Sequence, residues 1–229
     1  MFYPGWSFLK EKIILTEGVE LVEKISKEMT EYYADILITV IPDDINFMLN
    51  KIYQTLHGII SNSEQKIGIG FPDWYDYEVN VQRKIIKHGS IGNTIRLFGS
   101  INKLTSIINE PSLIHFTDTG CVRIYPIQQT PDTDSYVKFT RNRKKEKAGK
   151  HFVKRKKRRA ENRGNIFSKS EKRHNKTIPS VNIYYFKMLS NENGHSFSLF
   201  IERKFCDFQG NGSFSNYGLC KGTMSLPHF

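Results

Sequence analysis

The sequence predicts an α+β protein built in two parts. Strand-like runs alternate with helix-period apolar patterns in the first part, whereas strand-like runs and turn residues dominate the second. The stretch 138–176 carries 18 lysines and arginines and only three acidic residues. We therefore expect one domain over 29–125 and a β-hairpin-rich domain over 126–229 that carries an Arg/Lys-rich helix. An extension over 1–28 precedes both, and its residues suggest no chemistry.

The first domain is expected to begin with a strand and a helix. Residues 32–41 are rich in β-branched and aromatic side chains and end before Pro42, as strands often do. Asp43 or Asp44 can then cap a helix, because apolar residues recur at helical spacing from 45 to 60.

Shorter apolar runs continue the pattern. Strands are predicted at 66–71, 90–98, 113–116 and 121–124. A helix follows residue 98, because Leu104, Ile107 and Ile108 lie on one side at helical spacing. The order strand-helix-strand-strand-helix-strand is the ferredoxin-like, or RRM-like, arrangement, which RNA-recognition modules share with many unrelated proteins.

The second domain opens with a polar connector over 128–134 and then becomes strongly basic. A helix is expected from about 150 to 163, with Gly164 as its C-terminal stop. Strands are predicted at 181–189 and 197–208. Asn211-Gly212 is a β-hairpin signal that leads into 213–219, so the domain is expected to end in hairpins.

The basic stretch needs an anionic partner. The net charge of the whole chain is +11, and the excess positive charge lies in 138–176. Its centre, 150–159, offers only Phe152 and Val153 for burial, so it either stays solvated or binds a polyanion. A phosphate backbone suits it, because each neutralised phosphate releases counterions. The alternative is a solvated or disordered charge run, or a localisation signal.

Several other classes of protein fit the sequence poorly. Cys121, Cys206 and Cys220 form no C-x-x-C pair and have no histidine at zinc-ligand spacing, which argues against a disulfide framework and favours a reducing cytoplasm. The longest apolar run, 36–41, is too short to span a bilayer, and charges near the N-terminus argue against a signal peptide. The sequence contains no nucleotide-phosphate loop, and we expect no cofactor.

The sequence also lacks a carboxylate cluster that resembles a two-metal nuclease site. Asp73 and Asp76 lie in a predicted turn, where aspartates commonly form local hydrogen bonds. A nuclease of this sequence is therefore expected to cut without metal. That expectation points to RNA, whose 2′-hydroxyl can attack the adjacent phosphate when it is held in line and its proton is removed. Histidine is the usual proton-transfer residue near neutral pH.

One of the seven histidines, His57, lies where a role can be argued from spacing. On the helical wheel it lies just off the apolar stripe, beside Tyr53 and on the side of Asn46 and Asn50. A side chain there can be held by the edge of the core and still face a groove. The alternative is a half-exposed helix histidine without a role.

Four pieces of the chain resemble one known family. They are Leu56-His57, Lys66-Ile-Gly-Ile-Gly-Phe-Pro-Asp73, Phe197-Ser-Leu-Phe-Ile201 and Ser213-Phe-Ser-Asn-Tyr-Gly-Leu-Cys-Lys-Gly222. In this order and with the Arg-rich helix, they resemble the CRISPR repeat-processing endoribonuclease of type I-F systems, the Csy type. The resemblance runs from about residue 29 to residue 229.

The resemblance implies a fold, an activity and partners. The family has a ferredoxin-like N-terminal domain and a C-terminal part whose helix enters the major groove of a hairpin in CRISPR repeat RNA. It cleaves precursor CRISPR RNA at the base of the hairpin without metal or cofactor. It then keeps the mature crRNA and joins the other subunits of the type I-F surveillance complex. The expected location is the bacterial cytoplasm, with no membrane partner.

The resemblance also implies roles for the candidate active-site residues. By position, His57 matches the catalytic histidine and Ser190 the serine that holds the ribose at the cut. Tyr217 matches the tyrosine that orients the histidine, and Phe197 the aromatic residue that stacks at the base of the stem. Without the resemblance, Ser190 is a strand-end serine, Tyr217 a hairpin aromatic and Phe197 a core residue.

Further positions match RNA-binding residues of the family. The groove helix is expected to present Lys154, Arg155, Arg158 and Arg159 to the RNA. Arg141 takes the place of a base-reading arginine in the linker before that helix. Arg143 stands where the best-known member has glutamine. Lys154 replaces an arginine, and lysine lacks the forked donor geometry of a guanidinium.

The sequence thus predicts a metal-independent endoribonuclease. Attack by the 2′-hydroxyl would leave a 2′,3′-cyclic phosphate and a 5′-hydroxyl, with His57 moving the proton and Ser190 holding the sugar. One alternative is a non-catalytic RNA-binding subunit that retains and protects a processed guide RNA, and another is a basic ribosomal or nuclear RNA-binding protein. His57 and Ser190 separate the enzyme from a binder, because a pure binder needs neither.

Overall fold

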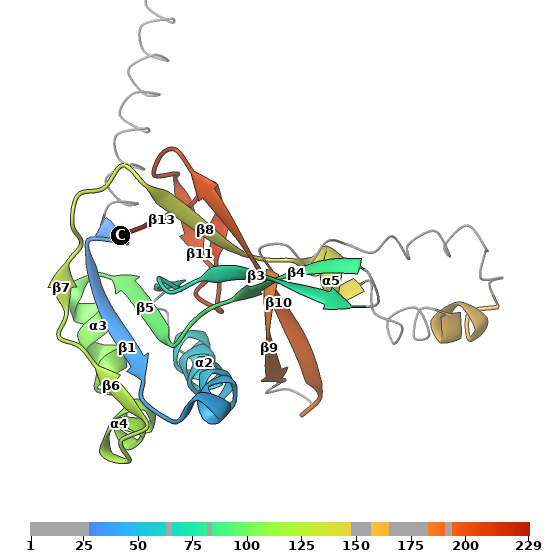
Figure 1. Ribbon diagram of the computed structural model, residues 1–229, viewed down its shortest axis with the longest axis horizontal. Coiled ribbons are helices and arrows are strands. Elements are labelled where there is room, and N and C mark those ends of the chain that lie inside the picture. The colour runs from blue at the N-terminus through green and yellow to red at the C-terminus, as the bar shows by residue number, and fades with distance from the viewer. Residues whose placement is uncertain (1–27, 63–65, 82–83, 148–156, 165–182, 191–193) are drawn as a thin grey trace, which may run out of the picture.

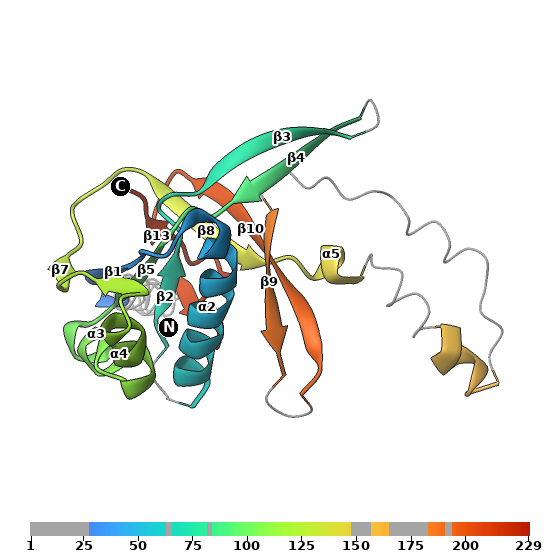
Figure 2. The same ribbon diagram turned by 60° about the horizontal axis from the view of Figure 1, so that its bottom comes forward.

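The computed structural model describes residues 28–62, 66–81, 84–147, 157–164, 183–190 and 194–229. Two antiparallel sheets form the body of the described chain, and a long two-stranded hairpin projects from it (Figures 1 and 2). Helices and antiparallel sheets occur together without parallel strand pairs among the described residues. The protein therefore has the α+β fold that the sequence predicts.

The first sheet contains the N-terminal strands, in the order β2-β5-β1-β6. Its central strand β1 (Tyr32–Ile38) pairs with β5 (Thr94–Gly99) and β6 (Val122–Ile124). On the outer sides, β2 (Gly68–Gly70) pairs with β5, and β7 (Gln128–Gln129) pairs with the start of β1. Every pairing is antiparallel, which is the sheet that a βαββαβ chain order produces.

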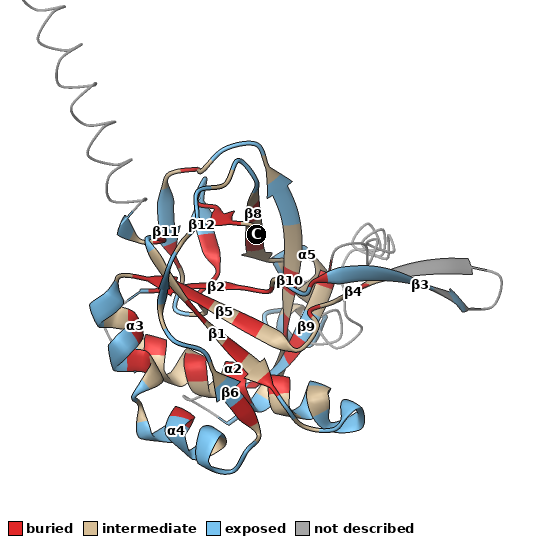
Figure 3. Ribbon diagram, turned by 60° about the vertical axis from the view of Figure 1, so that its left-hand side comes forward, coloured by how far each residue is buried: buried red, intermediate tan, exposed pale blue. Residues whose placement is uncertain are grey.

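Three helices lie on one side of this sheet (Figure 3). They are α2 (Ile45–Asn62), preceded by the 3-10 turn η1 (Pro42–Asp44), α3 (Ile101–Ile108) and α4 (Pro111–Asp118). The residues of α2 that are buried recur at helical spacing: Leu49, Ile52, Tyr53, Leu56 and Ile60. The apolar stripe predicted for this helix is therefore the face that packs into the core.

The second sheet is built from C-terminal strands. Its order is β13 (Leu226–Pro227), β8 (Tyr136–Arg141), β10 (Ser196–Cys206), β9 (Ile183–Leu189). The short helix α5 (Arg143–Lys147) follows β8 almost directly. As the last strand in this order, β9 has one side that does not pair with the sheet, and α2 contacts β9.

Two hairpins complete the described chain. They are β3 (Tyr75–Val81) with β4 (Lys84–Ser90), and β11 (Gly212–Phe214) with β12 (Cys220–Gly222). The first is the long projecting hairpin, and its strand β4 contacts β9.

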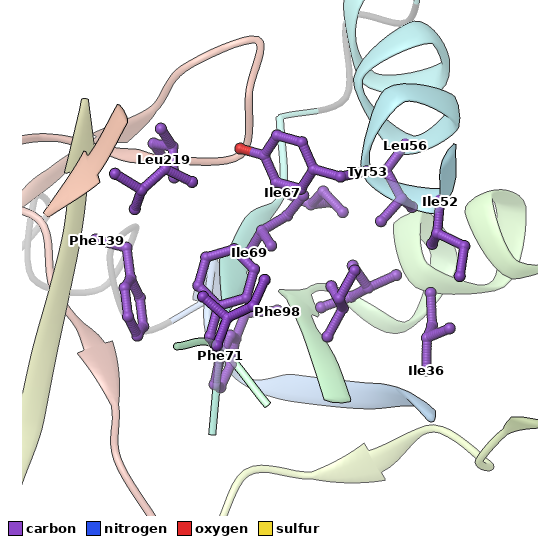
Figure 4. Packing of buried hydrophobic residues seen from close by; sticks show 14 of the residues in the cluster. Ile36, Ile52, Tyr53, Leu56, Ile67, Ile69, Phe71, Phe98, Phe139 and Leu219 are labelled. Carbon is purple, nitrogen blue, oxygen red and sulfur yellow. The ribbon is translucent and has the colours of Figure 1, made fainter. Parts of the chain in front are cut away.

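One hydrophobic core joins the two sheets. Phe71, which follows β2, meets Phe139 of β8 edge to face with ring centroids 5.1 Å apart (Figure 4). Tyr53 of α2 stacks on Phe186 of β9 at 4.0 Å. Burying each such ring contributes about 1.5–3 kcal/mol, so this packing holds the second sheet against α2. The proposed division between 29–125 and 126–229 stays a prediction.

The structure corrects the strand predicted at 113–116. These residues lie inside helix α4, whose first turn holds Pro111. Proline suits this position, because its missing N–H would have no partner inside the helix. Leu113 is the buried residue of α4, so a short apolar run that resembles a strand is one face of a helix.

The strand predicted at 90–98 is also wrong as a single element. β4 ends at Ser90 and β5 begins at Thr94. Gly92 between them has a φ of +69°, and a Cβ at this position would overlap Asp73. The chain therefore turns at this glycine. The prediction omits strands β3 and β8 and helix α5. In β3 the apolar residues alternate with polar ones, as in a strand with one polar face, whereas α5 contains no apolar residue.

The hairpin signal Asn211-Gly212 lies beside the last hairpin but is not its turn. Gly212 is the first residue of β11 and pairs with Gly222, and the chain reverses over 215–219.

The basic helix predicted from about 150 to 163 is described in part. Residues 157–161 are helical, and Gly164 with a φ of +70° follows the end of this helix, as predicted. Residues 150–156 and 1–27 lie outside the described residues. No helix in the described part of the chain is long and apolar enough to cross a membrane.

Candidate active site

His57 lies on α2 at the edge of the core and is half-buried. Its imidazole stacks on the phenol ring of Tyr217, with ring centroids 4.2 Å apart and planes inclined by 15°. Tyr217 belongs to the turn between β11 and β12. The fold therefore brings together two of the predicted site residues from opposite ends of the described chain.

The hydrogen bonds of His57 indicate which ring nitrogen carries the proton. Nδ1 lies 2.9 Å from the backbone oxygen of Asn216 and 3.0 Å from the hydroxyl oxygen of Ser61. A carbonyl oxygen can only accept, so its hydrogen bond requires the proton on Nδ1. In the neutral imidazole Nε2 then carries the lone pair, and this nitrogen can take a proton from a substrate.

The turn that carries Tyr217 is fixed to α2 and β2. The buried hydroxyl of Tyr53 donates to the backbone oxygen of Tyr217 at 2.8 Å, and Ile69 N donates to Gly218 O at 2.8 Å. Burial raises the pKa of Tyr53 well above its ordinary value, so its hydroxyl remains a donor. The hydroxyl oxygen of Ser215 accepts a hydrogen bond from the backbone N–H of Tyr217, at 3.3 Å. These bonds hold Tyr217 against α2.

Gly218 permits this close approach. Its φ is +70°, a conformation that side chains with a Cβ disfavour. A Cβ at this position would also overlap the side chain of Ile69 in β2. The Tyr-Gly-Leu sequence therefore has a structural reason for its glycine.

Arg141 lies beside Tyr217 and forms an ion pair with Glu146. Its guanidinium carbon is 5.2 Å from the ring centroid of Tyr217 and 5.8 Å from that of Phe197. Nε and Nη2 donate to the two carboxylate oxygens of Glu146 at 2.7 and 2.9 Å. Burial lowers the pKa of Arg141, but Glu146 and Tyr217 outweigh that effect and raise it. Arg141 is therefore a cation in a fixed orientation.

Ser190 follows β9 at the turn into β10, and α2 fixes the backbone beside it. Gln54 accepts a hydrogen bond from Leu189 N at 2.9 Å and donates one to Leu189 O at 3.2 Å. Gln54 lies one helical turn before His57. One helix therefore positions two of the predicted catalytic residues, His57 by carrying it and Ser190 through its neighbour.

The same face of α2 binds β9 at a second point. Asn50 Oδ1 accepts a hydrogen bond from Lys187 N at 2.6 Å, and the Tyr184 hydroxyl donates to Asn46 Oδ1 at 3.2 Å. A strand edge exposes N–H and C=O groups that need partners. Side chains spaced four apart on α2 supply partners along the edge of β9.

The remaining predicted RNA-binding residues lie apart from His57. Arg143 begins α5 and is exposed, and Arg158 and Arg159 are exposed on the helix over 157–161. This helix stands away from both sheets (Figures 1 and 2). Two other predicted residues, Lys154 and Arg155, lie outside the described residues. Arg141 is the last residue of strand β8 rather than part of a linker, because it pairs with Ile201.

Sequence reasoning missed three residues of this site. The Ser61 hydroxyl lies within hydrogen-bond distance of His57, and Gln54 accepts a hydrogen bond from Leu189. Glu146 forms an ion pair with Arg141. A signal existed for Gln54, since it lies four residues after Asn50 on the side of the helix that was predicted to face a groove. Within the described residues, no group of three or more His, Cys, Asp or Glu is placed to hold a metal ion.

A comparison with protein families decides what kind of protein carries this site. The family model of the CRISPR-associated protein Cas_Csy4 matches residues 33–229. The chain belongs to this family. The Csy4 family comprises the pre-crRNA endoribonucleases of type I-F CRISPR systems, so the chain is a CRISPR-associated, repeat-processing protein, and the resemblance seen in its sequence is confirmed. A search of curated proteins found no match to the chain.

Proposed function

We propose that this Csy4-family protein is a metal-independent endoribonuclease. It binds the hairpin of precursor CRISPR repeat RNA, cleaves at the base of the hairpin to give mature crRNA, and stays bound as a subunit of the type I-F surveillance complex in the bacterial cytoplasm. The observation that supports the catalytic part is the contact of His57 Nδ1 with a carbonyl oxygen, which leaves the lone pair of the neutral ring on Nε2.

The proposed reaction uses the RNA's own nucleophile. The 2′-oxygen attacks the adjacent phosphorus, the bond from phosphorus to the 5′-oxygen breaks, and the products are a 2′,3′-cyclic phosphate and a 5′-hydroxyl. The proton lost by the 2′-hydroxyl is balanced by the proton gained by the leaving 5′-oxygen. Neutral His57 can accept the proton of the 2′-hydroxyl at Nε2. Protonated His57 can then donate a proton from the same atom to the leaving 5′-oxygen.

Other residues of the site support this reaction by position and charge. Ser190 is proposed to hold the attacking ribose, which maintains the in-line geometry that intramolecular attack requires. Tyr217 is a positioning residue, because its ring packs on His57. Phe197 and Arg141 adjoin each other, so a ring for stacking and a cation proposed to read a base lie side by side.

The basic residues are proposed to bind the hairpin stem. Arg143, Arg158 and Arg159 are exposed, and an arginine can contact a phosphate or the edge of a guanine. The same role is proposed for Lys154 and Arg155 from the sequence. A non-catalytic subunit that only retains a guide would need these cations but would have no use for a lone pair on Nε2 of His57.

Cleavage of cognate repeat RNA in excess chelator tests this proposal. Cleavage should continue, and its upstream product should carry a 2′,3′-cyclic phosphate. A 2′-deoxy substitution at the nucleotide before the cut should abolish cleavage and leave hairpin affinity near that of the unmodified RNA. Loss of cleavage in chelator, or cleavage of the deoxy substrate, would contradict the proposed mechanism.

A further inference from the structure

A groove opens beside the candidate active site, between α2, the β3–β4 hairpin and β9. Its volume is about 770 Å³. Gln54 and Leu189 are among its lining residues. These two residues fix the backbone before Ser190, and Gln54 lies one helical turn from His57. The groove therefore begins at the site where the cut is proposed, and its lining includes residues of the projecting hairpin.

Exposed aromatic rings line this groove. On the hairpin, Tyr75 and Tyr77 are 56% and 44% exposed, and their ring centroids lie 6.1 Å apart. Phe47 of α2 is 58% exposed and Tyr185 of β9 is 48% exposed. Single exposed aromatics are ordinary, but several rings from three elements of one groove form a surface on which planar groups can stack.

The groove is also basic. Lys51 and Lys187 are lining residues, and no aspartate or glutamate of the described chain is among them. The acidic residues of β3, Asp76 and Glu78, alternate with its two groove tyrosines and so lie on the opposite face of the hairpin. The charge of the groove therefore favours an anionic occupant.

We propose that this groove binds the single-stranded RNA that continues past the cleaved linkage, on the far side of the cut from the hairpin. Aromatic faces with basic neighbours are the means by which proteins bind single strands with little sequence preference. The inference rests on the proposed function, because it takes His57 and Ser190 as the place of the cut. A cut at the base of a hairpin leaves an unpaired strand at this end, which favours RNA over a protein occupant.

Affinity for two uncleavable RNAs tests the inference. One is the hairpin ending at the cut, and the other adds about eight unpaired nucleotides, a length within the range of one single-strand site. A 2′-deoxy nucleotide before the cut prevents reaction in the longer RNA. The parent protein should bind the longer RNA more tightly. Tyr75→Ala combined with Tyr77→Ala should reduce this gain by roughly tenfold or more for each base that no longer stacks.

The groove lysines provide a second measurement. Lys51→Ala combined with Lys187→Ala should lower the salt dependence of the gain from the unpaired strand. The expected change in log–log slope is about 0.7 for each phosphate of the single strand that the variant no longer neutralises. A 2-aminopurine in the unpaired strand should be quenched on binding to the parent protein and less quenched with the tyrosine variant.

Tyr125→Ala is the matched control, because Tyr125 is 40% exposed and is not among the lining residues of the groove. It should keep the full gain from the unpaired strand. Equal affinity of the parent for both RNAs would overturn the inference and leave the groove to a protein partner. An equal loss for both RNAs in the tyrosine variant would also overturn it, since those rings would then serve the hairpin. A parent protein that binds neither RNA, and that does not cut the longer RNA when its 2′-hydroxyl is restored, would overturn the proposed function as well.

Discussion

Gln54 makes both of its side-chain hydrogen bonds to the backbone of Leu189, one to the N–H at 2.9 Å and one to the oxygen at 3.2 Å. The contact joins α2 to the edge of the C-terminal sheet, one helical turn from His57 and one residue from Ser190. The geometry of the candidate site thus depends on a helix from the first part of the chain and a strand from the second.

Replacing Gln54 with leucine should slow cleavage more than it weakens hairpin binding. The change leaves the N–H and oxygen of Leu189 without their partner, at a cost of about 1–3 kcal/mol for each unsatisfied group that stays out of water. Gln54→Glu keeps an acceptor for the N–H but removes the donor for the oxygen. Its cleavage rate should therefore lie between those of the parent and Gln54→Leu. Denaturant unfolding and single-turnover cleavage measure the two effects. A parental cleavage rate in Gln54→Leu would remove this contact from the site.

His57→Ala should abolish most cleavage and spare folding and hairpin affinity. General acid–base catalysis contributes about 10²–10⁴-fold, and single-turnover rates should fall by at least that order. His57 lies at the edge of the core, so its loss creates no deep cavity. His115→Ala on α4 is the control, because His115 is an exposed histidine on another helix. Equal cutting by His57→Ala and parent would support the binding-only alternative.

Substitutions at Tyr217 should distinguish the role of its ring from that of its hydroxyl. Tyr217→Phe keeps the ring that stacks on His57, so its cleavage rate should stay within a few-fold of the parent. Tyr217→Ala removes the stacking, worth about 0.5–1.5 kcal/mol for an aromatic pair, and should slow cleavage further. Rates measured across pH test orientation, because a freed imidazole should also change the pH profile. Slow cleavage by Tyr217→Phe would instead assign the role to the hydroxyl.

Gly218→Ala should destabilise the protein more than the same change at Gly120. Both glycines have a φ of +70°, so alanine costs about 1–2 kcal/mol of backbone strain at either position. At Gly120 a Cβ would meet nothing within 4 Å, whereas at Gly218 it would overlap Ile69. Thermal unfolding should therefore show the larger loss of stability for Gly218→Ala, accompanied by slower cleavage because its turn carries Tyr217. Equal losses would mean that the turn moves away from β2 at little cost.

Arg158→Ala combined with Arg159→Ala should weaken hairpin binding. If both contact phosphates, the slope of log affinity against log salt should fall by about two, one for each arginine. If either reads a base edge, the loss of affinity should depend on stem sequence, at roughly 1–3 kcal/mol for each bidentate contact. Arg123→Ala, at an exposed arginine of β6, is the control. An unchanged affinity in the double variant would mean that this part of the chain is solvated in the complex.

Local patterns predicted part of the fold well and part of it poorly. The helix from Ile45 was recognisable because its buried residues repeat at helical spacing, and β1 because β-branched and aromatic residues fill it. The apolar residues of α4 are too few to distinguish a helix face from a strand. The prediction omits β3, although its apolar residues alternate with polar ones and its partner β4 is the next strand along the chain. It also omits β8, which carries charged residues and pairs with β10 and β13, strands that lie far along the chain.

The sequence by itself determined the α+β class, the basic character of 138–176 and, through short motifs, the family. It also marked His57 and Tyr217 as candidates, because a helical wheel and a motif are local properties. Only the tertiary structure decided that these two rings stack, that Nδ1 of His57 binds the oxygen of Asn216, and that Gln54 holds Leu189. Each of these contacts joins segments that are distant in sequence. These contacts exist because the two sheets pack around one core, and no local pattern of residues predicts that packing.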